Sequence, residues 1–229
     1  MLSKSLALTI GAAAAFQTIT IKEDGQPKTL YIVGGDWYTP KGGDTMDIPH
    51  NGRSYLATSD SIDPDNFYGL NMLGGSIAYD VDLSQSGCSC NAALYLTSMP
   101  GLDEDGHTSP ENGYYCDAAG YGGIACPDFD IMEANTYAWQ TTPHKCDSPS
   151  DKGHFSKCDM VGNCFQIAKQ KLDGIYGPGD QNEINTLLPF HVKISFEETG
   201  HFQVEMTQNG KTHTMESDKN DPSCTSYMD

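Results

Sequence analysis

The sequence predicts an all-β protein, a two-sheet antiparallel jelly roll, and three observations carry that prediction. Apolar and polar residues alternate along several short segments, which is the period of a half-buried strand. Turns that contain Gly and Pro separate these segments, and strong helical patterns are nearly absent. Many short strands joined by such turns are typical of a β-sandwich or jelly roll. We expect one such domain over residues 16–229, although two small domains would also fit 229 residues.

The strand segments and the turns can be followed along the chain. The alternating segments cover residues 77–83, 94–99, 192–196 and 202–206. Asn209-Gly210 predicts a two-residue hairpin, and Asp24-Gly25 predicts a second one. Residues 165–172 form the only helical candidate, and it is short. Residues 100–127 and 141–164 are rich in loops, and a sheet scaffold carries its binding or catalytic face on such loops.

The first residues resemble a short secretory signal peptide. Lys4 precedes an apolar run that ends in small residues near Ala15, so we expect a leader over residues 1–15 and a secreted, extracellular protein. A first buried strand would give a similar pattern. The run is too short to span a bilayer, and no other stretch is apolar enough, so no membrane partner is expected.

The cysteines agree with export. An even number in an exported chain suggests four disulfides, with 105 possible connectivities. We expect most or all of the cysteines to be oxidised, clamping the loops over residues 88–164 and tying Cys224 back to the body of the protein. A zinc site is the competing interpretation, but the spacing is irregular and contains no CxxC pair, so no metal and no other cofactor is expected. The eight cysteines are Cys88, Cys90, Cys116, Cys126, Cys146, Cys158, Cys164 and Cys224.

The charge of the chain excludes one class of partner. With 31 acidic and 13 basic residues the net charge is −18. Nucleic acid is excluded as a partner because the neutralisation of phosphates requires clustered Lys and Arg. A neutral polymer meets no such repulsion, although simple solubility would also explain the charge. A monomer is expected.

The most informative stretch is residues 126–135, CPDFDIMEAN, in which three carboxylates interrupt an apolar strand. Asp128 and Asp130 are two residues apart and therefore share one face of the strand, whereas Glu133 would point to the opposite face. A β-bulge near Ile131-Met132 would return Glu133 to the same side, and bulges are enriched near active sites. We therefore predict a bulge between Asp130 and Glu133.

Three carboxylates on one concave face repel one another, and this repulsion raises the pKa of at least one of them. Glycosidic cleavage uses such a set, because one group protonates the leaving oxygen while another attacks the sugar or activates water. A calcium site or a solvated acidic edge strand would produce the same pattern, so the spacing alone leaves these alternatives open.

A resemblance to a known family favours the catalytic alternative. The run Asp128 to Asn135, followed by Thr142-Pro143-His144, resembles the signature Glu-x-Asp-x-x-Glu-Ala-Asn with Thr-Pro-His of glycoside hydrolase family seven. That family contains cellobiohydrolases and endoglucanases, which are β-jelly rolls with a retaining mechanism. Further segments resemble the family in the same order, from about Gly52 to Gly210. These segments are residues 79–84, 91–99, 114–117 and 176–179.

The resemblance implies a role for each site residue. Glu133 is expected to be the general acid/base, and Asp130 is expected to orient and polarise the nucleophile. His144 is expected near the acid/base, and Asn91 and Tyr95 are expected to line sugar subsites. The implied activity is the cleavage of internal β-glycosidic bonds in a β-glucan such as cellulose. A turn asparagine, a buried tyrosine and a loop histidine are structural alternatives for the last three residues.

The chain departs from the family pattern at the nucleophile, where Asp128 stands in place of Glu. The missing methylene retracts the carboxylate by roughly 1.5 Å, and covalent catalysis tolerates little displacement. Asp128 could still attack, or the enzyme could invert, or catalysis could be lost. The two carboxyl groups lie about 5–5.5 Å apart in retaining enzymes and about 6.5–9.5 Å apart in inverting enzymes. A retraction of this size therefore brings the expected separation of Asp128 and Glu133 to the limit between the two classes.

A second departure concerns the substrate cleft. The family's later segment has no counterpart here, and neither Trp37 nor Trp139 matches an aromatic platform of the family. We therefore expect a shallow open cleft and internal cutting. A non-catalytic carbohydrate-binding or decoy protein on the same scaffold is the alternative function.

Overall fold

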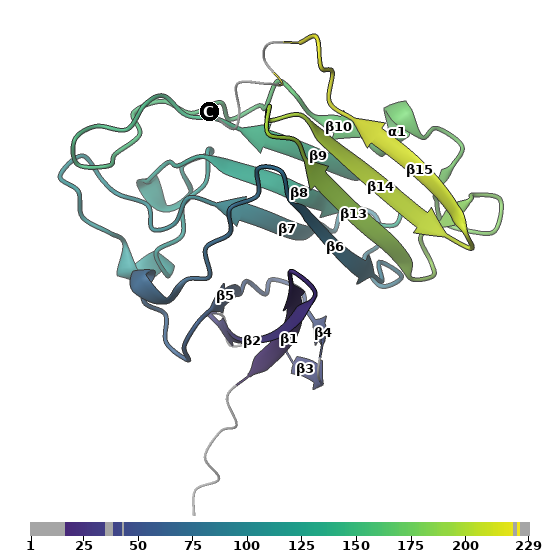
Figure 1. The fold of residues 1–229 in the computed structure, drawn as a ribbon, viewed down its shortest axis with the longest axis horizontal. Helices are drawn as coiled ribbons and strands as arrows, with labels where there is room; N and C mark the ends of the chain where they lie inside the picture. The colour runs from purple at the N-terminus through teal and green to yellow at the C-terminus, as the bar shows by residue number, and fades with distance from the viewer. Residues whose placement is uncertain (1–16, 35–38, 43, 222–223, 225–229) are drawn as a thin grey trace, which may run out of the picture. The chain divides into compact units, whose positions relative to one another are not determined.

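The computed structural model describes residues 17–34, 39–42, 44–221 and 224 (Figure 1). Contacts divide the chain into two compact units, Met1–Gly69 and Leu70–Asp229, and each is described by itself. The predicted leader and Trp37 lie outside the described residues, and the single domain over residues 16–229 stays a prediction. In the described part of the chain, no helix is long and apolar enough to cross a membrane.

The first unit is built from short strands. Its three-stranded sheet has the order β1-β2-β5, and β3 pairs with β4. The bounds are β1 Thr18–Glu23, β2 Gln26–Val33, β3 Thr39–Gly42, β4 Thr45–Asp47 and β5 Tyr55–Ala57, with a 3-10 turn η1 at Pro64–Asn66. Asp24 and Gly25 both have positive φ and join β1 to β2, with Glu23 opposite Gln26. The hairpin predicted there is confirmed, because these residues tolerate the left-handed conformation of such turns.

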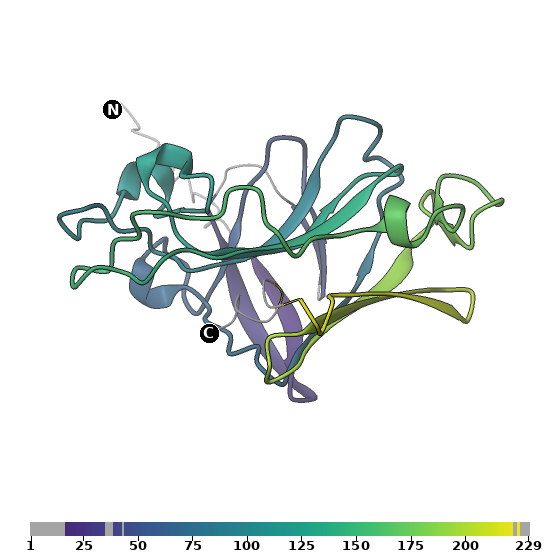
Figure 2. The ribbon, with the colours of Figure 1, turned by 90° about the horizontal axis from the view of Figure 1, so that it is seen from above.

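The second unit contains two four-stranded antiparallel sheets (Figures 1 and 2). One sheet has the order β10-β9-β8-β7 and the other has the order β15-β14-β13-β6. The strands of the first sheet are β7 Ala92–Thr97, β8 Asp128–Ala134, β9 Trp139–His144 and β10 Gln166–Ile167. The strands of the second are β6 Ser76–Val81, β13 Phe190–Phe196, β14 Phe202–Gln208 and β15 Lys211–Glu216.

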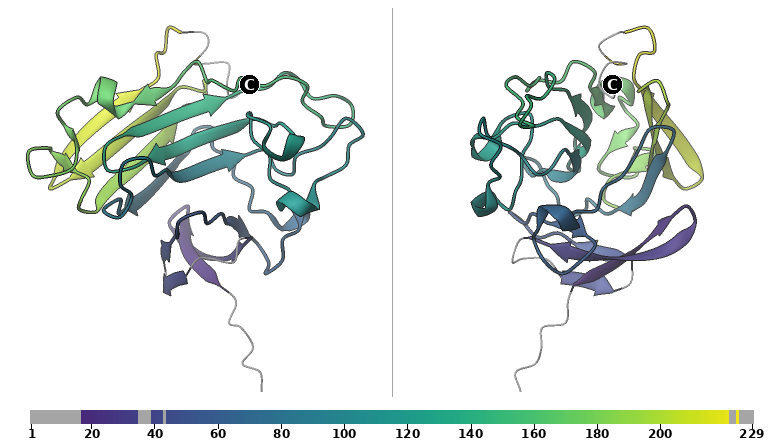
Figure 3. Two further views of the ribbon diagram at one scale, coloured as in Figure 1. Left: turned by 180° about the vertical axis from the view of Figure 1, so that it is seen from behind. Right: turned by 60° about the vertical axis from the view of Figure 1, so that its left-hand side comes forward.

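The two sheets, seen from two further sides in Figure 3, share one apolar core. Every second residue of β13 and β14 is buried, so the alternation in the sequence corresponds to an inward and an outward face. Phe129 of β8 meets Phe196 and Phe202 of the opposite sheet edge to face, at 5.2 and 5.0 Å between ring centroids. Burial of each large apolar side chain contributes about 1.5–3 kcal/mol. The predicted all-β jelly roll is confirmed.

Short elements complete the second unit. They are the 3-10 turns η2 Pro110–Asn112 and η3 Tyr121–Gly123, the helix α1 Ala168–Lys171, and the parallel pair β11 Tyr176–Gly177 with β12 Ile184–Asn185. The helical candidate over residues 165–172 contains β10 followed by the single turn α1. Asn209-Gly210 connects β14 to β15 with Gln208 opposite Lys211, so the hairpin predicted there is also confirmed.

Three disulfides tie the loops of this unit together. They join Cys116 to Cys126, Cys146 to Cys158, and Cys164 to Cys224. The prediction of four bridges was wrong by one, because Cys88 and Cys90 are free and exposed. These two cysteines lie two residues apart in the exposed segment before β7, and the other six are paired with one another. The last bridge attaches residue 224 to the body of the unit, as predicted.

Candidate active site

A β-bulge in β8 determines which side chains reach the outer face of its sheet. Met132 is opposite Leu94, and the next pair along the ladder is Asp130 with Tyr95, so Ile131 is the extra residue. On the other side, the register with β9 shifts between Asp130 and Glu133. The bulge predicted between these two carboxylates is confirmed.

The bulge is held by side chains of the neighbouring strand. The Thr141 hydroxyl donates to the Ile131 carbonyl at 2.8 Å and accepts from the Trp139 Nε1–H at 3.0 Å. Trp139 and Thr141 are fully buried, so this pairing satisfies a carbonyl that the register shift removes from the ladder. Trp139 is therefore a core residue and cannot serve as a platform for a sugar ring.

The three carboxylates of β8 occupy the same face. Phe129 points into the core, so Asp128 and Asp130 point away from it. Tyr95 pairs with Asp130 across the ladder, and its hydroxyl donates to Glu133 Oε1 at 2.8 Å. A contact of this kind requires Glu133 to lie on the side of Tyr95 and Asp130, which is the arrangement that the bulge was expected to produce.

Two donors converge on one oxygen of Glu133. Asn91 Nδ2 donates to Oε1 at 3.0 Å, beside the bond from Tyr95. Burial, followed by the negative charges of Glu133 and Asp130, raises the pKa of Tyr95, so its phenol remains a donor. In the described part of the chain no side chain or backbone group bonds to Oε2 of Glu133. A proton carried by this carboxyl group therefore belongs on Oε2.

Asp128 is the first residue of β8, and a backbone N–H group holds its side chain. It is 9% exposed, and its Oδ1 accepts the Ala118 N–H at 3.0 Å. Burial and then the charge of Asp130 raise the pKa of Asp128 to about 7, although the Ala118 N–H and His144 act in the opposite direction. The carboxyl group at the nucleophile position is consequently half-ionised near neutral pH.

Asp130 and His144 form a buried pair. His144 Nε2 lies 3.4 Å from Asp130 Oδ2, and its Nδ1 lies 2.7 Å from the Asp159 carbonyl. Burial lowers the pKa of His144, but the bonds to Asp130 and Asp159 and the charges of Asp128 and Asp130 raise it to about 9. Both ring nitrogens face oxygen acceptors, so the imidazolium is the form that fits. Within the described residues, the buried Asp130 Oδ1 has no hydrogen-bond partner.

Two loops supply groups that the sequence interpretation missed. The Cys116–Cys126 disulfide closes the loop that brings the Ala118 N–H to Asp128. In the other loop, Asp159 Oδ1 accepts the backbone N–H groups of Val161 and Gly162, and this turn directs the Asp159 carbonyl to His144. A Cβ at Gly162 would collide with the side chain of Thr142, so this turn requires glycine. The run Asp159 to Asn163 is a turn signal that could have pointed to this loop.

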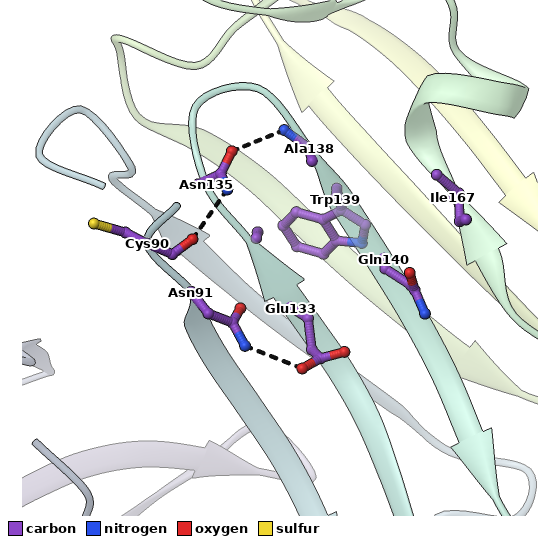
Figure 4. Close-up of a pocket in the computed structure, with 9 residues that line it drawn as sticks. Cys90, Asn91, Glu133, Asn135, Ala138, Trp139, Gln140 and Ile167 are labelled. Atoms are coloured by element: carbon purple, nitrogen blue, oxygen red, sulfur yellow. Dashed lines mark hydrogen bonds between the residues drawn. The ribbon is translucent and has the colours of Figure 1, made fainter. Parts of the chain in front are cut away.

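A pocket of about 270 Å³ adjoins Glu133 (Figure 4). Glu133 is its only charged lining residue, and Asp128, Asp130 and His144 lie outside its lining. In Figure 4, Asn91 lies on one side of Glu133, and Gln140 lies on the adjacent strand on the other side. The lining residues are Cys90, Asn91, Glu133, Ala134, Asn135, Ala138, Trp139, Gln140 and Ile167.

The six residues predicted from the sequence form one network of two groups, one around Glu133 and one around Asp130, and Tyr95 connects them because it binds the first and pairs with the second across the ladder. His144 was expected near the acid/base, but it stands opposite Asp128 and binds Asp130, and no contact among the described residues joins it to Glu133. Asn91 and Tyr95 bind Glu133, His144 binds Asp130, and Asp128 interacts electrostatically with Asp130 and His144. The network combines a carboxyl group with an open oxygen, a second carboxyl group that ionises near neutral pH, and a neighbouring cation. Such a set can donate a proton at one position and supply a nucleophile or base at another.

Comparisons with known proteins give relatives for part of the chain and for its fold. No protein-family model matches the chain. Endoglucanase 1 of Humicola insolens is 30% identical over 154 residues, and endoglucanase type C of Fusarium oxysporum is 28% identical over 153 residues. Each alignment covers 56% of this chain but only 38% and 36%, respectively, of the relative, so the chain spans little more than a third of their length.

Two solved structures illustrate the common fold. Glycosynthase mutants of Humicola insolens Cel7B give a TM-score of 0.64 at 20% identity, covering 94% of this chain and 78% of that chain. A GH7 family cellobiohydrolase from Daphnia pulex gives a TM-score of 0.61 at 18% identity, covering 91% and 75%. At these identities the structures establish a shared architecture.

Proposed function

We propose that this chain, a divergent member of glycoside hydrolase family seven, is a secreted enzyme that cuts internal β-glycosidic bonds of a β-glucan such as cellulose. The observation that carries the proposal is the environment of Glu133. Asn91 and Tyr95 fix one of its oxygens and leave the other free beside a pocket. Three disulfides and the predicted leader support secretion.

Glu133 acts as the general acid. Its Oε2 proton passes to the glycosidic oxygen as the bond from that oxygen to the anomeric carbon breaks. The hydrogen bonds from Asn91 and Tyr95 then stabilise the carboxylate that remains, because bonds to an ionised acceptor are stronger than bonds to a neutral one. The same carboxylate can later accept a proton from water.

Asp128 supplies the second carboxylate. In its ionised form it either bonds to the anomeric carbon or takes a proton from the water that does so. With a pKa of about 7, its active form becomes more abundant as the pH rises through neutrality. His144 favours that ionised form by its charge, and Asp130 positions His144.

A non-catalytic carbohydrate-binding function is the second candidate, and Asp128 is the observation that favours it. The side chain is one methylene shorter than the glutamate of the family and is nine-tenths buried. A protein that only binds carbohydrate would keep the sugar-binding face, but its Asp128 carboxylate would not need to reach the anomeric carbon.

Reducing-sugar release from soluble β-glucans tests the proposal. Carboxymethyl cellulose, mixed-linkage glucan and xyloglucan would be offered to the wild type and to Glu133→Gln as the blank. Glu205→Gln, on the outward face of β14, is the matched control, because Glu205 pairs with Lys193 at the surface of the second sheet. We expect the wild type and the control to release sugar and the blank to lose at least about 100-fold. If the wild type releases no more reducing sugar than the blank on any of the glucans, the carbohydrate-binding function is favoured instead.

A further inference from the structure

Gln140 lies beside Glu133 and has no role in the network described above. The two residues are directly opposite each other in the ladder between β8 and β9. Glu133 therefore has Tyr95 of β7 and the preceding Asn91 on one side and Gln140 of β9 on the other. Figure 4 places the second oxygen of Glu133 on the side away from Asn91.

The amide of Gln140 is held in place but is only partly satisfied. Its Nε2 donates to Thr142 Oγ1 at 2.8 Å, and Thr142 is fully buried, so the amide has a fixed orientation. Among the described residues no hydrogen bond reaches Gln140 Oε1. The half-buried side chain thus presents an acceptor and a second N–H to the pocket.

The pocket has the chemistry of a site for a neutral sugar ring. Amide groups of Asn91 and Gln140 can bind hydroxyls, while Ile167 and Ala138 offer apolar surface to the C–H groups of a ring. The lining residues include no Lys, Arg or His, so the pocket does not suit a phosphorylated ligand.

We propose that Gln140 determines specificity by binding a hydroxyl of the sugar that leaves on protonation by Glu133. This inference rests on the proposed function. The pocket contains Glu133 but not Asp128, and the sugar whose oxygen receives the proton lies on the side of the acid that is away from the nucleophile. Gln140 lines that pocket beside Glu133, on the neighbouring strand β9.

The test compares a sugar leaving group with an aryl leaving group. Gln140→Ala is expected to lower kcat/KM about 3- to 10-fold for cellotetraose, the usual value of one neutral hydrogen bond. It should leave kcat/KM unchanged for the release of 4-nitrophenol from 4-nitrophenyl β-cellobioside. Gln203→Ala on β14 is the control. Equal losses on both substrates would indicate a disturbed Thr142 and would overturn the proposal.

A binding measurement keeps the inference testable if the proposed function fails, which inactivity of the wild type on both substrates would indicate. Calorimetric titration with cellobiose is carried out on Glu133→Gln, with and without Gln140→Ala. We expect the second substitution to weaken binding about 3- to 10-fold. Unchanged affinity, or no binding of cellobiose by either variant, would overturn the role of Gln140.

Discussion

The two sheets of the second unit share one core, but their outer faces differ. The β15-β14-β13-β6 sheet keeps its register throughout, and its outward side chains form exposed pairs such as His191 with Asp80 and Lys193 with Glu205. The β10-β9-β8-β7 sheet contains a bulge and carries Asp128 and Asp130 at 9% and 6% exposure. The β15-β14-β13-β6 sheet follows the ordinary rules of stability, and the β10-β9-β8-β7 sheet departs from them.

The buried carboxylates of the β8 sheet destabilise the fold, and the packing of the core does not explain their presence. Burial of a carboxylate is unfavourable unless it is paired and hydrogen-bonded, and one oxygen of Asp130 has no partner among the described residues. Natural proteins break such local rules mainly at functional sites. The comparison therefore locates function on one sheet and support on the other, and each prediction below tests that division.

The largest effect is expected from Asp128→Asn, which retains an acceptor for the Ala118 N–H. If Asp128 is the nucleophile or base, turnover should fall by at least about 1,000-fold.

The same variant should be more stable above pH 7, by about 1–4 kcal/mol. In the folded protein the pKa of Asp128 is raised from 3.8 to about 7, so ionisation opposes folding. That penalty is absent below pH 3.8, grows between these values and is complete above pH 7. Reducing-sugar assays and urea unfolding at pH 5 and pH 8 measure both effects.

Asp128→Glu distinguishes an active site that is adapted to the shorter side chain from a site that has lost catalytic activity. If the strand is adapted to the shorter side chain, the longer one should leave activity unchanged or reduce it. An inactive wild type that gains activity with Asp128→Glu would contradict the role of Asp128. Product stereochemistry adds a further distinction, because β-anomer formed first means that Asp128 attacks the sugar, whereas α-anomer formed first means that it activates water.

The second effect, on the supporting sheet, should appear in stability alone. Ile194 is fully buried on β13, and Ile194→Ala should reduce the free energy of unfolding by about 2–5 kcal/mol because it leaves a cavity. The kcat measured well below the melting temperature should not change. Urea unfolding and initial rates provide the two measurements. A loss of kcat comparable to that of Asp128→Asn would show that the two sheets do not divide function from support.

Much of the fold could be predicted from the sequence because periodicity reports burial directly. The inward residues of β13 and β14 are apolar except Gln208 at the end of β14, and these strands have the predicted faces. The odd spacing of Glu133 also predicted the bulge, since a strict period of two would have placed this residue in the core.

The groups that tune the site could not be predicted because they depend on contacts between distant loops. Nothing around Ala118 indicates that its N–H reaches Asp128, and the Asp159 carbonyl has no sequence signature of its own. Disulfide pairing is also a three-dimensional property, so an even number of cysteines did not reveal that Cys88 and Cys90 are free.

The third effect concerns the cation beside Asp128. The positive charge of His144 lowers the pKa of Asp128, so His144→Asn should raise that pKa further and move the acid limb of kcat/KM to higher pH. At pH 6 we expect a loss of about tenfold, which corresponds to one pKa unit. An unchanged acid limb would contradict the coupling between His144 and Asp128.

The same substitution should change the alkaline dependence of stability. In the folded protein the pKa of His144 is raised from 6.5 to about 9, so its stabilising contribution is complete below pH 6.5 and is lost as the pH rises through 9. The wild type should therefore lose stability over this range, and His144→Asn should lose less. Thermal unfolding at pH 6.5 and pH 9.5 measures the difference.

The smallest effect is expected from the exposed ion pair of the supporting sheet. Lys193 Nζ and Glu205 Oε2 are 3.8 Å apart with side chains 45% and 32% exposed, whereas the His144–Asp130 pair is 3.4 Å apart at 11% and 9%. Water screens the first pair and not the second. A double-mutant cycle with Lys193→Gln and Glu205→Gln should give a coupling of about 0–1 kcal/mol, which 1 M salt removes, without any change in kcat. The corresponding cycle with His144→Asn and Asp130→Asn should give a larger coupling that salt hardly changes. If the exposed pair gave the larger coupling, burial would not be the property that distinguishes the two sheets.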